Sequence, residues 1–294
     1  MIASLVLIWG VSWPVYKIAL NYTPPVLFAG MRCLLGGLLL LLVALPRYRQ
    51  LRFRRTWFIY VISGLLNAVL FFGLQTIGLQ YLPAGLFSVV VYLQPVLVGV
   101  FAWLWLGEGM SLLKVFGLVL GFMGVIAISL ESLSGRISGV GLLLALASAT
   151  SWALGTVYTK RIGPAVDSVW LVAGQFFFGG LVTVVLGAGM ENLSAIDWSS
   201  AAYLVSLAYG GVFGVAIAWL LYFALVRAGE ASKVASFTFM VPLISVLIGT
   251  LFLHEPFTSY LLAGIVCIAV SIYLVNRPVR KRTTSEEIQA GLTR

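Results

Sequence analysis

Long apolar stretches alternate with short polar ones along the whole chain. Ten of these stretches approach the roughly 20 residues that an α-helix needs to cross a hydrocarbon layer about 30 Å thick. They lie at residues 2–20, 26–45, 58–80, 84–106, 112–130, 138–159, 169–189, 200–226, 232–253 and 258–276. The pattern predicts an all-α polytopic membrane protein with ten transmembrane helices.

The second five stretches repeat the first five. Matching positions are Trp9 and Trp152, Lys17 and Lys160, Arg32 and Gln175, and, at a slightly larger shift, Pro95 and Pro242, and Glu108 and Glu255. We therefore predict two five-helix repeats, residues 1–131 and 138–276, followed by a tail at 277–294. Because each repeat has an odd number of spans, the second repeat must cross the membrane in the opposite direction, which is the plan of many transporters.

The basic residues indicate which loops face the cytoplasm, because Lys and Arg are retained on that side. With the N-terminus inside, 15 of the 18 Lys and Arg residues fall in inner loops and the tail. The loop from Arg47 to Arg55 is rich in arginine, whereas its mate in the second repeat, around Glu191 and Asp197, has no Lys or Arg. Both termini are therefore predicted to be cytoplasmic.

Composition narrows the class of protein. The 294 residues are 61% hydrophobic and only 9% charged, with a mean hydropathy of +1.08, which excludes an ordinary soluble domain. The net charge of +9 follows from the loop signals and contacts with anionic lipid, so nucleic acid is not an expected partner. One His, two Cys in apolar spans and no Gly-rich phosphate loop leave no expected metal, cofactor or enzyme active site.

Polar and aromatic residues recur on one face of the first helix of each repeat. In the first repeat they are Trp9, Ser12, Trp13 and Tyr16, and the matching positions in the second are Trp152, Gly155, Thr156 and Thr159. Two interpretations are open: the side chains line a substrate cavity, or they form an aromatic belt and packing faces. Tyr16 and Thr159, near the span ends, suit the second interpretation.

The third helix of each repeat carries a second such face. Asn67, Phe71 and Gln75 are spaced four residues apart, and their mates are Gly214, Ala218 and Tyr222, with Trp219 adjacent. Amides inside a membrane need hydrogen-bond partners, either in a hydrated cavity or on a neighbouring helix. Both alternatives remain open at Asn67 and Gln75.

The fourth helix of each repeat contains a proline near its middle. Pro95 and Pro242 each remove a backbone donor and interrupt the helix, so they are candidate gating hinges, with a fixed kink as the alternative. The cavity-lining candidates near them are Ser88, Tyr92, Thr238 and Phe239.

Charged residues supply the remaining candidates. Arg32 lies inside a span, where it can reach outward, bond to helix-end carbonyls or face the cavity and attract a carboxylate. Glu108 and its mate Glu255 stand at turns, where acids usually cap the next helix or fix the turn by accepting backbone hydrogen bonds. No Asp or Glu lies in mid-span, which favours a facilitated or weakly coupled carrier. The fifth and tenth helices, with Gly117-x-x-x-Gly121, are typical of scaffold helices or of a homodimer contact through the outer helices.

Several short motifs resemble the EamA family of the drug/metabolite transporter superfamily. They are Trp9-Gly10 with Ser12 and Lys17, Gly-Met-Arg-Cys-Leu-Leu at 30–35, Gln94-Pro95-Val96, Leu106-Gly107-Glu108, Val241-Pro242-Leu243 and His254-Glu255. The resemblance implies a bacterial inner-membrane carrier with an inverted five-plus-five bundle. It also implies a cavity lined by helices 1, 3, 4, 6, 8 and 9. Gln175 at the position equivalent to Arg32 puts a symmetric role for that arginine in doubt.

We therefore expect a carrier that moves a small-molecule metabolite through the lipid bilayer by alternating access. The resemblance favours export of amino acids or related compounds, and the aromatic candidates suit a hydrophobic or aromatic amino acid. Uptake, efflux of drugs or other metabolites, and a membrane-embedded enzyme are the alternatives.

Overall fold

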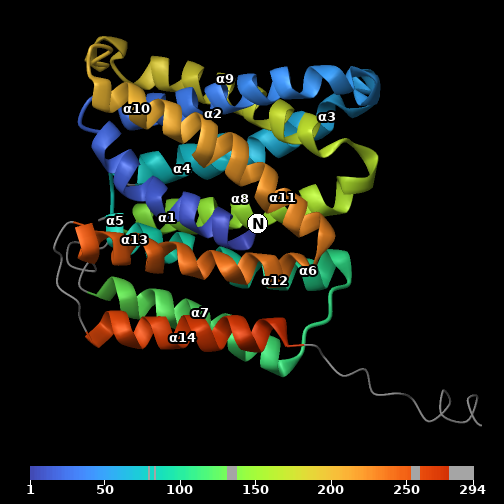
Figure 1. Cartoon of the computed structure of the whole chain (residues 1–294), viewed down its shortest axis with the longest axis vertical. Helices are drawn as coiled ribbons and strands as arrows, with labels where there is room; N and C mark the ends of the chain where they lie inside the picture. The colour runs from blue at the N-terminus through green and yellow to red at the C-terminus, as the bar shows by residue number, and fades with distance from the viewer. Residues whose placement is uncertain (79, 83, 131–137, 253–258, 278–294) are drawn as a thin grey trace, which may run out of the picture.

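The computed structural model describes residues 1–78, 80–82, 84–130, 138–252 and 259–277, and every element in these ranges is helical (Figure 1). Within them, nine helical stretches are long and apolar enough to cross a membrane, and 231–245 is a shorter apolar stretch. The predicted all-α membrane fold is thus confirmed. Glu255 and the tail after 277 lie outside the described residues.

The first repeat begins with α1 (Ile2–Ala19), α2 (Pro25–Ala44) and the 3₁₀ turn η1 (Leu45–Gln50). Its third span consists of α3 (Phe53–Gly64), the π-helical turn η2 (Leu65–Leu70) and α4 (Phe71–Gly78). The remaining helices are α5 (Ala84–Val91), α6 (Gln94–Leu106) and α7 (Leu112–Ser129). Pro25 at the first turn of α2 and the Ser111 hydroxyl at the start of α7 are ordinary helix-start signals.

The second repeat follows the same order. It comprises α8 (Gly139–Ile162), η4 (Gly163–Ala165), α9 (Ser168–Met190), η5 (Leu193–Ala195), α10 (Ala201–Tyr209), the π-helical turn η6 (Gly210–Ile217), α11 (Ala218–Ala228), α12 (Ala231–Ser236), the 3₁₀ turn η7 (Phe237–Phe239), α13 (Met240–Phe252) and α14 (Ser259–Asn276). The Ser138 and Ser200 hydroxyls cap α8 and α10.

The fourth span of each repeat is interrupted just before its proline. The helix is broken at Tyr92 and Leu93 ahead of Pro95, and by the tighter turn η7 ahead of Pro242. A proline cannot donate to the preceding turn, which explains the position of both breaks. The sequence did not predict η2 and η6, since the wider π turn has no residue signature of its own.

Helices of one repeat pack against helices of the other in matching pairs. α1 packs on α13 as α8 packs on α6, and α2 packs on η6 as α9 packs on η2. Glycines let α2 and α9 approach closely along their length, because an added Cβ at Gly37 would lie 2.4 Å from the backbone of Phe177. Figure 1 shows α2 with α9 at one side of the bundle and α7 with α14 at the other.

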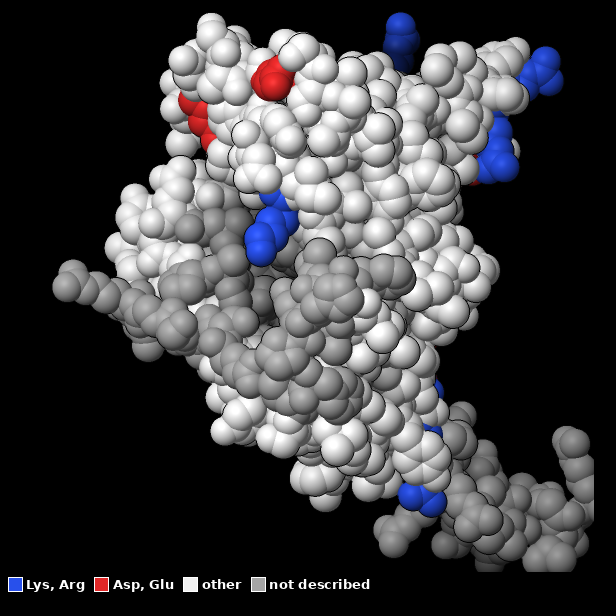
Figure 2. Space-filling model, turned by 60° about the vertical axis from the view of Figure 1, so that its left-hand side comes forward, with Lys and Arg blue, Asp and Glu red and all other residues white. Residues whose placement is uncertain are grey.

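The charged loops tie the two repeats together at opposite ends of the helices. At one end, Glu191 accepts hydrogen bonds from Val26 N (2.9 Å) and Leu27 N (2.8 Å), capping α2. At the other, Asp167 caps α9 and lies 3.7 Å from the Arg47 guanidinium. Figure 2 shows acidic side chains at the upper left and most of the visible Lys and Arg at the right. Most of the surface between these ends carries no charged side chain in this view, as a lipid-facing belt requires.

Candidate functional site

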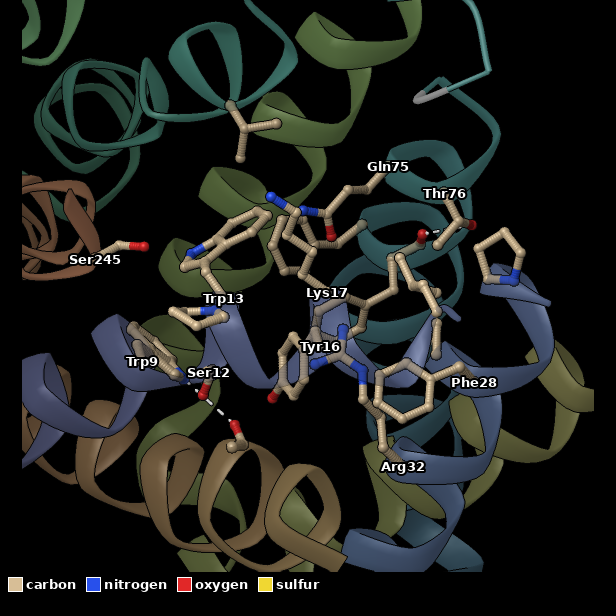
Figure 3. Close-up of a pocket in the computed structure, with 18 of the residues that line it drawn as sticks. Trp9, Ser12, Trp13, Tyr16, Lys17, Phe28, Arg32, Gln75, Thr76 and Ser245 are labelled. Atoms are coloured by element: carbon tan, nitrogen blue, oxygen red, sulfur yellow. Dashed lines mark hydrogen bonds between the residues drawn. The ribbon is translucent and has the colours of Figure 1, made fainter. Parts of the chain in front are cut away.

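A cavity of about 450 Å³ lies in the middle of the bundle (Figure 3). It is lined from α1, α2, α4, α8, α11 and α13, with Val91 and Tyr92 from the break in the fourth span. At one end it reaches Lys17 and Leu20, which are exposed at the end of α1. The cavity therefore opens toward the α1–α2 connection.

Eight of the fourteen predicted cavity residues line this space: Trp9, Ser12, Trp13, Phe71, Gln75, Tyr92, Trp152 and Trp219. Tyr16, for which a belt position was the preferred interpretation, also lines it, as does Arg32. The cavity is also lined by four residues that the sequence pattern did not predict, Phe28, Phe72, Thr76 and Ser245. Phe28 lies one helical turn before Arg32, a spacing that could have revealed it, whereas Ser245 carried no comparable signal.

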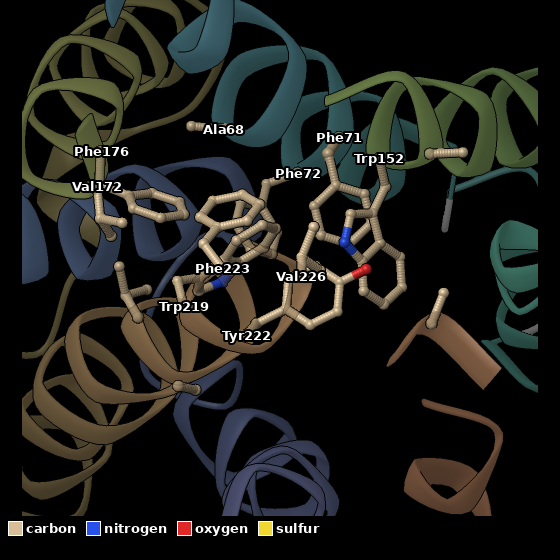
Figure 4. Packing of buried hydrophobic residues seen from close by; sticks show 14 of the residues in the cluster. Ala68, Phe71, Phe72, Trp152, Val172, Phe176, Trp219, Tyr222, Phe223 and Val226 are labelled. Carbon is tan, nitrogen blue, oxygen red and sulfur yellow. The ribbon is translucent and has the colours of Figure 1, made fainter. Parts of the chain in front are cut away.

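Aromatic rings from both repeats form the floor of the cavity. The Trp9 ring lies 5.7 Å, centroid to centroid, from those of Trp152 and Trp219, and Phe71 lies 4.9 Å from Trp152. The Trp9 indole donates to the carbonyl of Gly214 (3.3 Å), which holds that ring in place. Figure 4 shows Phe71, Phe72, Trp152 and Trp219 packed together. The floor offers a rigid stacking surface for an apolar or aromatic group.

A hydrogen-bonded layer lies behind the floor. The Tyr222 hydroxyl accepts from Gln94 Nε2 (3.2 Å) and lies 3.2 Å from Thr156 Oγ1. Thr156 and Tyr222 were predicted to line the cavity, but both are completely buried and do not. They join α6, α8 and α11 beneath Trp152.

Asn67 also lies away from the cavity. Its Nδ2 donates to Gln175 Oε1 (3.2 Å), so the amide joins η2 to α9, as in the interhelical alternative. The four-residue spacing predicted that Asn67 would lie on one helix face with Phe71 and Gln75. The π turn at Leu65–Leu70 breaks that periodicity, because its i→i+5 bonds widen the turn.

The other candidates near the prolines have structural positions. Thr238 Oγ1 donates to the carbonyl of Ala235 (2.8 Å), and Phe239 is buried where its ring approaches Gly121 of α7. Ser88 is half-buried on α5 and is not part of the cavity lining. Of this group only Tyr92 reaches the cavity, where its hydroxyl accepts from Trp13 Nε1 (3.2 Å).

Arg32 is a buried cation in the cavity wall. Its guanidinium carbon lies 4.1 Å from the ring centroid of Tyr16 and 4.3 Å from that of Phe72, close enough for cation–π attraction. Lys17, at the mouth, is the second cation in the lining, which contains no Asp or Glu among the described residues.

The end of the bundle opposite the cavity mouth is closed by a cluster centred on Glu108. Its carboxylate accepts from Lys160 Nζ (2.8 Å), Ala231 N (2.5 Å) and the amide and hydroxyl of Ser232. Lys114 Nζ lies 3.8 Å away. Burial alone would raise the pKa of Glu108, but the hydrogen bonds from Lys160, Ser232 and Ala231 hold it below its ordinary value.

Glu108 thus caps α12 in the second repeat. The prediction that it caps the next helix was wrong about the helix: α7, which follows Glu108 in the chain, is capped by Ser111.

The described residues contain no group of three or more His, Cys, Asp or Glu that could hold a metal ion.

Comparisons with known proteins identify the family. The model of the EamA-like transporter family matches residues 1–130 and 139–277. An uncharacterized transporter of Bacillus subtilis, YvbV, is 57% identical over 276 residues, covering 94% of this chain and 90% of the relative. A probable amino-acid metabolite efflux pump of Escherichia coli is 26% identical, covering 92% of this chain and 91% of the relative.

A solved crystal structure supports the same fold. It superposes with a TM-score of 0.82 at 18% identity and covers 94% of both chains. The family is one of membrane transporters rather than enzymes. With one family model matching nearly the whole length in two consecutive segments, the chain belongs to the EamA-like transporter family.

Proposed function

We propose that this transporter exports small amphipathic metabolites, such as hydrophobic or aromatic amino acids, across the bacterial cytoplasmic membrane by alternating access. The observation that carries the proposal is the central cavity of about 450 Å³, whose aromatic floor combines Trp9 from one repeat with Trp152 and Trp219 from the other. Its volume falls in the range of sites for small organic ligands, roughly 300–1,000 Å³.

The matched helix pairs support an alternating mechanism. If the repeats are inverted, as their odd span number demands, the pairs α1–α13 and α8–α6 are equivalent contacts near opposite membrane faces. Loosening one pair while tightening the other would move access from one side to the other. The breaks before Pro95 and Pro242 are the proposed hinges.

The distribution of basic residues supports an orientation. Lys114, Lys160 and Lys233 gather around Glu108, so we place that closed end in the cytoplasm. The cavity then opens to the outside in this state. A distant relative is named a probable amino-acid metabolite efflux pump, which supports export of compounds of that class.

Counterflow in proteoliposomes tests the substrate class. Vesicles preloaded with unlabelled tryptophan, phenylalanine or leucine should accumulate the labelled compound, and Trp152→Phe should weaken this uptake by shrinking the floor. The matched control is Trp103→Phe, since Trp103 is exposed on the lipid side of α6 and makes no contact with the cavity. Equal loss in both variants, or no counterflow with any of the three, would contradict the proposal.

Direction needs a separate measurement. Overexpression in intact cells should raise tolerance to a toxic aromatic amino-acid analogue if the protein exports it. Increased sensitivity instead would favour the alternative, an uptake permease.

We also propose that any homodimer uses the lipid-facing sides of α7 and α14. Their small-residue faces already pack on one another, since a Cβ added at Gly117 would come within 2.9 Å of Val275 and one at Gly124 within 2.9 Å of Ile268. Cross-linking through a cysteine at exposed Met123 would detect such a pair.

A further inference from the structure

Building on the proposed function, we infer that Arg32 binds a carboxylate of the substrate and that the transporter selects small amphipathic organic acids. A ring or aliphatic group would rest on the aromatic floor while the carboxylate meets the guanidinium. The amino group of an amino acid is tolerated on this scheme but is not what the site recognises.

Arg32 has the properties of an unsatisfied binding group. It is only 6% exposed, its Nε has no hydrogen-bond partner, and it forms no ion pair with any residue that the structure describes. The rings of Tyr16 and Phe72 offset part of the cost of burying this charge. Because no described residue supplies an anion, a carboxylate that enters the cavity gains a strong, bidentate interaction there.

Comparison of the two repeats shows why this guanidinium is left free. At the position equivalent to Arg32, Gln175 bonds to Asn67. The residue equivalent to Asn67 is Gly214, which has no side chain to offer Arg32. In the contact between α9 and η2, the two amides hydrogen-bond to each other. In the equivalent contact between α2 and η6, Arg32 has no such side-chain partner and lies at the cavity.

The charges of the cavity discriminate between classes of substrate. Its described lining contains Lys17 and Arg32 but no carboxylate that would pair with an organic cation. Phe72 links the two parts of the site, since it lies 4.3 Å from the Arg32 guanidinium and 4.5 Å from the ring of Phe71. A carboxylate separated from its ring by a short chain can therefore reach Arg32 while the ring contacts the floor (Figure 3).

Four compounds with one skeleton test the inference in proteoliposomes: 3-phenylpropionate, phenylalanine, 3-phenylpropionamide and 3-phenylpropylamine. The two carboxylates should be bound and moved at least about tenfold better than the amide and the amine, a difference expected of a charge-assisted pair. In Arg32→Gln the preference for the carboxylates should disappear, while the amide should be bound and moved as in the unmodified protein. Arg32→Lys should restore part of it, because it keeps the charge but loses the planar fork.

Lys17→Gln is the matched control, since it removes the other cation of the cavity at its exposed mouth and should reduce the preference much less. If the amide or amine is moved as well as the acids, or Arg32→Gln keeps the preference, the inference is wrong although the proposed function stands. If none of the four compounds is bound or moved, the proposed function itself fails. Should Arg32→Gln not fold, the comparison of the four compounds on the unmodified protein still decides.

Discussion

Replacing Glu108 by Gln should open the closed end of the bundle. The Glu108 side chain is 7% exposed and joins the first repeat to the second, where it contacts Lys160 on α8 and the first amides of α12. Gln has nearly the same shape and keeps one oxygen acceptor, so the substitution removes the charge with little change in packing.

The expected size of the effect follows from these contacts. Removing one partner of a buried ion pair usually costs about 3–5 kcal/mol. Here the cost should be lower, because Lys160 retains the carbonyl of Gly229 and Lys114 retains Glu230. We expect a loss of about 2–3 kcal/mol, which corresponds to a shift of roughly 30- to 150-fold in the equilibrium between closed and open ends.

Thiol labelling measures that equilibrium. Thr156 is completely buried between the aromatic floor and the Glu108 cluster, so a cysteine there should react slowly with a membrane-impermeant maleimide. In inside-out vesicles, with Cys33 and Cys267 replaced, Glu108→Gln should raise the labelling rate by about the same 30- to 150-fold.

Glu230→Gln is the internal control. Glu230 pairs with Lys114 and Lys233 in the same cluster, but its side chain is 39% exposed, and such pairs contribute about 0–1 kcal/mol. Its effect on labelling should therefore be small. If the two variants accelerate labelling equally, or Glu108→Gln changes it less than about threefold, Glu108 does not hold this end closed.

Three further predictions concern pH, topology and packing. Because the pKa of Glu108 is lowered in the closed state, the Glu108 end of the bundle should stay closed from about pH 8 to 5. It should open only as the pH falls below about 4.3, the ordinary Glu value. Faster labelling of the cysteine at position 156 near pH 6 would refute this. A cysteine at Gln50 should be protected from an external maleimide and one at Ala195 should react, whereas the reverse would overturn the orientation. Gly214→Ala should impair substrate binding in proteoliposomes, since the added Cβ would lie 2.0 Å from the hydroxyl of Tyr16. Gly73→Ala should leave substrate binding unchanged, since a Cβ at Gly73 would have no atom within 4 Å.

The spans and their breaks were predictable because they depend on local chemistry. Apolar length defines a span, and a proline defines where hydrogen bonding is lost. The breaks before Pro95 and Pro242 therefore appeared where the sequence placed them. The membership of each polar face was less predictable, because it depends on constant helical periodicity, and the π turn at Asn67 rotates that residue away from Phe71.

Contacts between the repeats were not predictable from either repeat alone. Glu108 stands beside a turn and an obvious following helix, yet its partner is the start of α12, more than a hundred residues later. Nor does an arginine in an apolar span reveal whether it has a partner. The reason that Arg32 lacks such a partner lies in the other repeat: Gln175 bonds to Asn67, whereas the residue equivalent to Asn67 is Gly214, which has no side chain.

The two π turns bear on the history of the chain. η2 and η6 occupy matching places in the third spans of the two repeats, and each widened turn holds one residue more than an α-helical turn would. A single insertion in an ancestral gene, before it was duplicated, accounts for both. If the repeats are inverted, as the odd number of spans in each predicts, that ancestor would have been a five-span protein able to pair with an upside-down copy of itself. The arginines at 47–55 and the acidic loop at 191–197 are then the features that would restrict each copy to one orientation.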